Sequence, residues 1–482
     1  MKSLRAVSLL CVVLAGAVGV ASAQTWTPVT ATPPLASPGT ALLLTDGRVF
    51  MQDSCGTDWW TLTPDQTGSY INGTWAEVAS TPSDYSPLYF ASAVLPSDEV
   101  VVMGGEYNGA NCNAVWTNLG VIYNPVTNKW KNLKPPSGWS NVGDAQSVVL
   151  ADGTFMVADC CTTQEALLNA TKLTWTSTGT GKNDINDEEG WTLLPSGEVL
   201  TVDANCGSCL NSEIYNPATG SWSSAGSTIV ELVDLSSHEL GPAVLRPDGT
   251  VIYMGATGHN AVYDSNTGVW SAAADFPKNT QGQQLDIADG PAALLPDGNV
   301  LAFTSPGVYN TGGQFFEWNG SSWISVPNVP NGPGDSSYYG RMLELPTGQI
   351  LFTDGSSDVE IYTPSGSANS AWAPVITSYK SPLTHGKTST LKGTQLNGMS
   401  QGAAYGDDAQ MASNYPLIQI TNTASGHVVY ARTYDFSSMG VATGSTVVSV
   451  KFEVPATIET GASTLLVVTN GIASTPVNVT IK

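Results

Sequence analysis

The stretch Val244-Leu245-Arg246-Pro247-Asp248-Gly249-Thr250-Val251-Ile252-Tyr253-Met254 consists of an apolar run, a tight polar turn and a second apolar run. The β-branched and aromatic residues on both sides favour strands, and Pro-Asp-Gly is typical of the turn that joins two antiparallel strands. About twenty residues later comes Trp270, after a small and an apolar residue. This order of signals predicts a β-hairpin followed by an outer strand that carries tryptophan.

The same module occurs seven times between Ala36 and Trp372. Its turns are Thr45-Asp46-Gly47, Ser97-Asp98-Glu99, Ala151-Asp152-Gly153, Pro195-Ser196-Gly197, Pro247-Asp248-Gly249, Pro296-Asp297-Gly298 and Pro346-Thr347-Gly348. Counted from positions 44, 95, 150, 194, 246, 295 and 345, the steps are 51, 55, 44, 52, 49 and 50 residues. A period near fifty without helical patterning predicts an all-β chain and a seven-bladed kelch-type β-propeller over residues 24–376.

Tryptophan marks the expected outer strand of each module. These residues are Trp75, Trp130, Trp175, Trp222, Trp270, Trp323 and Trp372, and at this spacing we expect them to pack between blades. One further strand of this kind, which contains Trp26, precedes the first turn. Because a strand from one terminus can complete the blade made by the other, we expect Trp26 to close the seventh blade. Trp372 would then be a second outer strand or the start of a linker.

Both ends of the chain lie outside the repeat. Residues 1–23 read as a secretory signal peptide, with Lys2 and Arg5 before an apolar stretch and Ala21-Ser22-Ala23 as the cleavage site. No later run reaches the roughly 18 apolar residues of a membrane span. Residues 377–482 contain short β-type runs separated by turns, which predicts an immunoglobulin-like sandwich. We expect a secreted, monomeric protein, extracellular or periplasmic.

The composition restricts the class of partner. The net charge is −23 and becomes −25 without Lys2 and Arg5, while charged residues make up 12% of the chain. Nucleic acid is excluded as a partner because phosphate binding requires clusters of Lys and Arg. The acidity serves either solubility or the binding of cations.

Six cysteines remain after the signal peptide, all within the first four modules: Cys55, Cys112, Cys160, Cys161, Cys206 and Cys209. An even number in a secreted chain predicts disulfides. Cys55 with Cys112 would join neighbouring blades, and Cys206 with Cys209 would close a local loop. Cys160 and Cys161 would form a vicinal bridge, or each would reach a cysteine of the next blade.

A kelch propeller followed by an immunoglobulin-like domain resembles the galactose oxidase and glyoxal oxidase family. The turn repeat, the tryptophan strands and the segment Ser400–Leu417 carry the resemblance over nearly the whole mature chain. In that family a C-terminal His enters the propeller channel and binds copper together with a Tyr-His pair before a late blade. A Tyr cross-linked to a Cys supplies the radical cofactor.

The copper ligands of the family do not carry over to this chain. The Tyr-His pair falls on Tyr338-Tyr339, and the C-terminal His falls on Gly406 or Asp407. The four histidines stand elsewhere, at His238, His259, His385 and His427, and no Tyr–Cys pair is recognisable. Copper(II) favours imidazole ligands. We therefore expect the fold of the family without its copper centre.

The repeat also aligns the positions that face the channel mouth in the family. Nine residues before the last residue of each turn stand Pro38, Phe90, Asp144, Glu188, Leu240, Asp289 and Tyr339. The expected ligand-binding residues at the mouth are therefore Asp144, Glu188, Asp289, Tyr338, Tyr339, Arg341, Asp407 and Asp408. Converging carboxylates repel one another. They would be protonated or solvated on an open rim, paired with Arg341, or bound to calcium at Asp289, Asp407 and Asp408.

Acids beside tyrosines are suited to sugar binding, because a ring stacks on an apolar sugar face and carboxylates accept hydroxyl protons. We therefore expect a non-catalytic secreted protein that binds a carbohydrate or an extracellular partner at the mouth, without a cofactor unless calcium binds. The alternative is an enzyme, either a divergent galactose-oxidase-like oxidoreductase or another carbohydrate-active protein that uses paired carboxylates.

Overall fold

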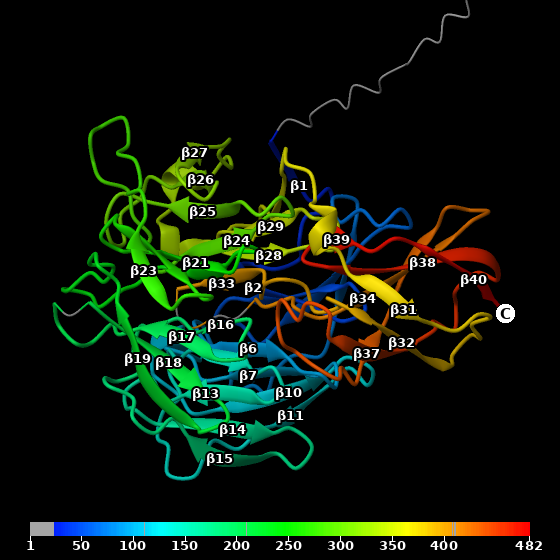
Figure 1. The fold of residues 1–482 in the computed structure, drawn as a ribbon, viewed down its shortest axis with the longest axis horizontal. Coiled ribbons are helices and arrows are strands. Elements are labelled where there is room, and N and C mark those ends of the chain that lie inside the picture. The colour runs from blue at the N-terminus through cyan, green and yellow to red at the C-terminus, as the bar shows by residue number, and fades with distance from the viewer. Residues whose placement is uncertain (1–23, 110, 209, 407, 409–410) are drawn as a thin grey trace, which may run out of the picture.

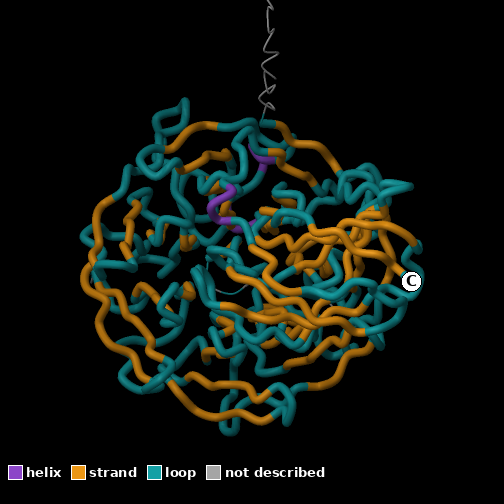
Figure 2. The backbone as a smooth tube through the Cα atoms, turned by 45° about the vertical axis from the view of Figure 1, so that its right-hand side comes forward, coloured by secondary structure: helices purple, strands orange, loops and turns teal. Residues whose placement is uncertain are grey.

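The computed structural model describes residues 24–482 apart from 110, 209, 407, 409 and 410. Strands and loops make up nearly all of this part of the chain, as Figure 2 shows. Its helices are three 3-10 turns: η1 (Gly332–Gly334), η2 (Ser337–Tyr339) and η3 (Ser370–Trp372). The expectation of an all-β chain is confirmed. The expected signal peptide, residues 1–23, lies outside the described residues.

Seven antiparallel sheets lie between residues 25 and 363, and each contains four strands from this part of the chain. The strands of the first six sheets follow in chain order, whereas the last sheet takes its fourth strand from the start of the chain. The first three are β2 (Pro38–Leu43), β3 (Val49–Asp53), β4 (Trp59–Thr63), β5 (Thr74–Glu77); β6 (Ala91–Val94), β7 (Val100–Met103), β10 (Gly120–Asn124), β11 (Lys129–Asn132); and β12 (Ser147–Val149), β13 (Phe155–Ala158), β14 (Glu165–Asn169), β15 (Thr174–Thr178). A small hairpin, β8 (Tyr107–Asn108) and β9 (Asn113–Ala114), extends from the second sheet.

The remaining four sheets repeat this order. They are β16 (Thr192–Leu193), β17 (Val199–Val202), β18 (Asn211–Asn216), β19 (Ser221–Ser227); β20 (Ala243–Leu245), β21 (Thr250–Met254), β22 (Asn260–Asp264), β23 (Val269–Ala272); β24 (Pro291–Leu294), β25 (Val300–Thr304), β26 (Gln314–Trp318), β27 (Trp323–Ser325); and β28 (Arg341–Glu344), β29 (Ile350–Thr353), β30 (Glu360–Thr363), β1 (Thr25–Pro28). The turns predicted from the sequence join the first two strands of each sheet. Gly249, for example, has φ +86°, a left-handed conformation that glycine adopts without a steric penalty.

The sheets are arranged around a ring in a propeller-like fold. Figure 1 shows the colour passing round this ring from blue through cyan to green and yellow. The first strand of each sheet is buried along its whole length. These strands pack side by side, and β28 of the last sheet contacts β2 of the first. The apolar core therefore lies between the sheets and around the ring axis.

Strand β1 completes the last sheet. It pairs with β30, with Trp26 opposite Tyr362, whereas Trp372 lies in the 3-10 helix η3. The Trp26 ring contacts Phe315, Phe352 and Tyr362, at centroid distances of 4.6, 5.7 and 4.9 Å. The prediction that Trp26 supplies the closing strand is confirmed.

The C-terminal part forms two further sheets, seen at the right of Figure 1. One contains β31 (Val375–Ser378), β32 (Thr388–Thr394), β37 (Val447–Glu453) and β36 (Thr433–Tyr434). The other contains β35 (Val428–Ala431), β34 (Leu417–Asn422), β38 (Gly461–Thr469), β39 (Ile472–Ala473) and β40 (Val477–Ile481). Alternating inward side chains such as Leu391, Ile420, Val450 and Leu465 build a separate core between them.

One C-terminal strand leaves these sheets and enters the ring. Strand β33 (Ala403–Tyr405) pairs with β24 at the inner edge of the sixth sheet, and it also packs on β20 and β28. Below it, the buried Glu344 accepts hydrogen bonds from Asn470 and Ser413, both at 2.9 Å. The C-terminal part is thereby anchored to the centre of the ring.

Two disulfides lie among the described cysteines. Cys55–Cys112 joins the first and second sheets, which confirms that expected pair, and Cys160–Cys161 is the vicinal bridge. The expected pair of Cys206 with Cys209 is not described, because Cys209 lies outside the described residues.

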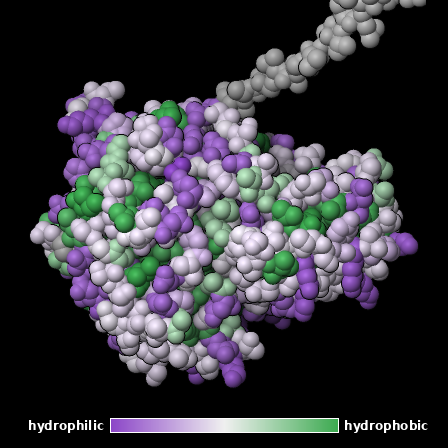
Figure 3. Space-filling view, viewed as in Figure 1, coloured by the Kyte–Doolittle hydropathy of each residue, from purple (hydrophilic) through white to green (hydrophobic). Residues whose placement is uncertain are grey.

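No helix in the described part of the chain has the length and apolar character needed to cross a membrane. On the face in Figure 3, hydrophobic side chains form separate patches among weakly polar ones.

Candidate functional site

A cavity of about 400 Å³ opens at one end of the ring. Ten residues line it: Tyr89, Glu106, Tyr107, Asp144, Glu188, Ser237, Glu239, Asp289, Tyr309 and Tyr338. Most of them stand just before the first strand of a sheet, and the others, such as Glu106 and Tyr309, follow the second strand. All these segments reach the same end of the ring, so the second to seventh sheets each contribute a polar or aromatic side chain.

Three of the lining residues have a left-handed backbone where the chain enters the first strand. The φ angles are +51° at Tyr89, +61° at Glu188 and +52° at Asp289. Such angles are uncommon for residues with a side chain and persist where the surrounding structure imposes them, often at ligand sites. Two of the three, Glu188 and Asp289, stand at positions that the repeat aligns.

Three of the carboxylates that line the cavity lie close to one another. Glu188, Glu239 and Asp289 each offer an oxygen, and these three oxygens lie within 4.8 Å of one another. Glu239 is 4% exposed, and its Oε1 accepts a hydrogen bond from the Tyr309 hydroxyl. Burial and that hydrogen bond raise the pKa of Tyr309, so the phenol stays protonated and acts as the donor.

Glu106 adds a carboxyl group at the side of the cavity. Burial raises its pKa to about 7, and the charges of Asp408 and Glu239 act in the same direction. Asp187, adjacent to Glu188, also has a raised pKa, again chiefly through burial. The mouth is therefore a region of strong negative potential in which a carboxyl can hold a proton near neutral pH.

Arg341 lies behind the wall of the cavity. Its guanidinium is 3.5 Å from the ring centroid of Tyr405 and 5.0 Å from that of Tyr89, and it donates hydrogen bonds to the carbonyls of Tyr338 and Gly340. Burial alone would lower its pKa, but Tyr405 and the carboxylates of Asp408 and Asp289 raise it above the ordinary value. Arg341 is thus a fixed cation held between two rings.

The C-terminal segment passes tightly beneath the carboxylates. The Gly406 amide donates to the Gly290 carbonyl at 3.1 Å. A Cβ at Gly406 would lie 2.4 Å from Asp289 Oδ1, and one at Gly190 would lie 2.6 Å from the Gly406 carbonyl oxygen. Only residues without a side chain fit at these two places, so the segment supports Asp289 by direct contact.

The structure brings four of the eight predicted mouth residues into the cavity: Asp144, Glu188, Asp289 and Tyr338. Tyr339 stacks on Tyr338 at 4.3 Å but is 46% exposed and does not line the cavity. Arg341 and the buried Asp408 lie behind the wall, and Asp407 is outside the described residues.

Among the residues that line the cavity, Glu106, Tyr107, Ser237 and Tyr309 were not predicted from the sequence. Tyr89 and Glu239 are next to aligned positions, and that adjacency is a usable signal. Glu106, Tyr107 and Tyr309 lie in segments after the second strand of a sheet, and the repeat does not align these segments.

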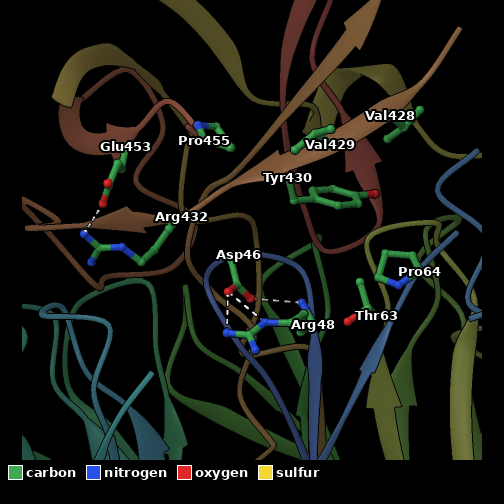
Figure 4. A pocket seen from close by; sticks show the side chains of 10 residues that line it. All are labelled: Asp46, Arg48, Thr63, Pro64, Val428, Val429, Tyr430, Arg432, Glu453 and Pro455. Atoms are coloured by element: carbon green, nitrogen blue, oxygen red, sulfur yellow. Dashed lines mark hydrogen bonds and ion pairs between the residues drawn. The ribbon is translucent and has the colours of Figure 1, made fainter. Parts of the chain in front are cut away.

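A second cavity of about 400 Å³ lies between the first sheet and the C-terminal part, where Val428, Val429 and Tyr430 face Thr63 and Pro64 (Figure 4). Its charged side chains are already paired. Arg48 contacts Asp46 at 2.7 Å, and Arg432 contacts Glu453 at 2.9 Å. The mouth cavity, with its converging carboxylates, is the stronger candidate for a functional site.

Comparisons with known proteins give the fold. No family model and no curated protein matches this chain. Among solved structures, a fungal alcohol oxidase of the AA5 family, in complex with copper, has a TM-score of 0.53 at 12% identity and covers 96% of this chain and 100% of its own. A catalytically inactive virginiamycin B lyase from Staphylococcus aureus, with quinupristin, has a TM-score of 0.50 at 7% identity, over 71% and 99%. At such identities the likeness concerns the fold alone.

The donor set of the cavity differs from what copper(II) prefers. Its described lining residues are carboxylates, tyrosines and one serine, with no His or Cys among them. His259 and His427 are paired with Asp275 and Glu459 at exposed positions, and His238 Nδ1 lies 3.3 Å from the Ala204 carbonyl. Oxygen donors of this kind suit hard cations and hydroxyl-rich ligands rather than copper(II).

Proposed function

We propose that the seven sheets are the blades of a kelch-type β-propeller over residues 24–376, and that residues 377–482 form an immunoglobulin-like domain. The closed order of the sheets and the separate core of the C-terminal part support this assignment. We also propose that residues 1–23 direct secretion. The Cys55–Cys112 bridge is of the kind that persists in oxidising, extracellular surroundings.

The function that the geometry supports best is non-catalytic binding of a carbohydrate at the mouth. The observation that carries it is the grouping of five carboxyl groups and four tyrosines around one cavity of about 400 Å³. Carboxylates accept the protons of sugar hydroxyls, while tyrosine rings cover the apolar face of the sugar. A cavity of this size accommodates a small ligand or the end of a chain.

A glycan array with the purified protein tests this proposal. We expect binding to a restricted set of neutral or cationic glycans, because an acidic cavity repels sialylated and sulfated ones. The array is read in calcium and again in chelator. Absence of binding under both conditions would reject the carbohydrate proposal.

A second candidate is a divergent oxidoreductase of the galactose oxidase type. The likeness to the alcohol oxidase over 96% of this chain, and the entry of β33 into the ring, favour it. Against it, Tyr338-Tyr339 stands where the family has Tyr-His, and we propose that copper is not the cofactor. An assay for hydrogen peroxide released during oxidation of primary alcohols to aldehydes by oxygen separates the two candidates. Turnover dependent on copper would favour the oxidase.

A further inference from the structure

We propose that Glu188, Glu239 and Asp289 form a binding site for one divalent cation of the size of calcium. The site differs from the calcium site expected from the sequence, since it uses Glu188 and Glu239 in place of Asp407 and Asp408. The cation site stands on its own geometry. Its further role, in which the bound cation contacts ligand hydroxyls, rests on the proposed carbohydrate function.

The spacing of the three carboxylates matches this cation. Their oxygens lie within 4.8 Å of one another. Calcium binds oxygen at 2.3–2.6 Å, so ligands on opposite sides of it are about 4.6–5.2 Å apart and adjacent ligands are closer. Magnesium requires shorter distances and a stricter octahedron. One cation can therefore contact all three oxygens with little movement of the side chains.

A buried oxygen of Glu239 provides independent support. Glu239 is 4% exposed, and no described residue forms a hydrogen bond with its Oε2. Its other oxygen, Oε1, is already occupied by the Tyr309 hydroxyl. A buried carboxylate oxygen without a partner is costly. A cation in the cavity that Glu239 lines would satisfy this oxygen.

The charge around the site favours a divalent ion over an organic ammonium. Three carboxylates meet here, and Asp144 and Glu106 line the same cavity. Arg341 is held behind the wall by Tyr405 and the carbonyls of Tyr338 and Gly340. A monovalent ammonium would compensate one of the three central charges, whereas calcium compensates two.

The four tyrosines in the cavity give a direct optical test. Terbium(III) binds at calcium sites and emits when a nearby tyrosine is excited, and Tyr309 already contacts Glu239. We expect terbium emission from the wild-type protein that calcium displaces, with a single site by isothermal titration with calcium. Glu239→Gln and Asp289→Asn should each weaken calcium binding at least about tenfold, which corresponds to about 1.4 kcal/mol.

Two controls keep the result interpretable. Asp84→Asn removes one negative charge from an exposed loop residue that does not line the cavity, and calcium affinity should stay unchanged. Glu188→Gln removes a less buried carboxylate of the same site, so it still tests the proposal if the Glu239 variant does not fold. Circular dichroism checks that each variant is folded. Equal calcium affinity in wild type and folded site variants would overturn the proposal, as would tighter binding of methylammonium than of calcium.

The cation site and the carbohydrate function fail separately. Calcium binding by the wild type with an empty glycan array would reject the proposed function and support the cation site. Glycan binding by a protein that does not bind calcium would reject the cation site and support the function.

Discussion

Replacement of Trp26 by alanine should destabilise the whole ring, because this residue closes it. Strand β1 pairs with β30 over Thr25–Pro28, so the first residues of the described chain complete the last sheet. The Trp26 ring packs on Phe315, Phe352 and Tyr362, and its Nε1 donates to the Pro327 carbonyl at 2.7 Å. Alanine removes all of these contacts and leaves the backbone pairing of the strand in place.

The expected loss of stability in Trp26→Ala follows from these contacts. Truncation of a core tryptophan to alanine costs about 3–5 kcal/mol. Trp26 is only partly buried, so a loss near the lower limit, about 3 kcal/mol, is expected. About 1 kcal/mol of it belongs to the hydrogen bond with Pro327. At about 2 °C per kcal/mol for a large domain, the melting temperature should fall by about 6 °C.

Differential scanning calorimetry of the wild type and two variants measures this effect. Trp26→Phe keeps most of the aromatic packing and loses the hydrogen bond, so it should cost about 1 kcal/mol. Trp372→Ala changes the residue that lies outside the sheets and should have the smaller effect. If Trp26→Ala melts within about 1 °C of the wild type, the inference that β1 seals the ring is wrong.

Three further predictions concern the contacts that hold the site and the sheets. Burial raises the pKa of Glu344 from 4.5 to about 7. Between these two pH values the folded state binds more protons than the unfolded state, so the free energy of unfolding decreases as the pH rises. Glu344→Gln should remove up to about 3 kcal/mol of this decrease, measured by urea unfolding at about pH 5 and about pH 8. An unchanged pH dependence would contradict this. Gly406→Ala should displace Asp289 and weaken calcium binding, and equal affinity would refute the contact. Replacing Cys55 and Cys112 by serine should cost about 2–4 kcal/mol in guanidinium unfolding, and no loss would count against the bridge.

The sequence predicted the repeated parts of the fold because their signals are local. Pro247-Asp248-Gly249 and its equivalents encode turns through the backbone preferences of proline and glycine. The tryptophan strands follow the turns at a regular distance. The closing role of Trp26 could be inferred because the chain has one tryptophan strand more than it has turns. Asp289 and Glu188 were found for the same reason, since the repeat aligns them.

The rest of the site depends on contacts between segments that are remote in the chain. Glu106 and Tyr309 lie in loops of different length after the second strand of their sheets. The fifty-residue repeat therefore does not align them with equivalent positions in the other modules. Pairing with Arg341 was one of three alternatives expected for the acids, and the carboxylates of Asp408 and Asp289 do raise the pKa of its guanidinium. In the structure it stacks on Tyr405, because β33 comes from the C-terminal part and places that ring over it. Pattern reasoning cannot predict a contact that the pairing of β33 with β24 creates.

The central claim is that the mouth is an oxygen-donor binding site rather than a copper redox centre. It is tested most directly by elemental analysis of the purified protein after incubation with copper(II) and calcium and removal of free metal. The account predicts stoichiometric calcium without stoichiometric copper, because carboxylates and tyrosines line the cavity. Stoichiometric copper together with the visible absorption of a tyrosyl radical would contradict it.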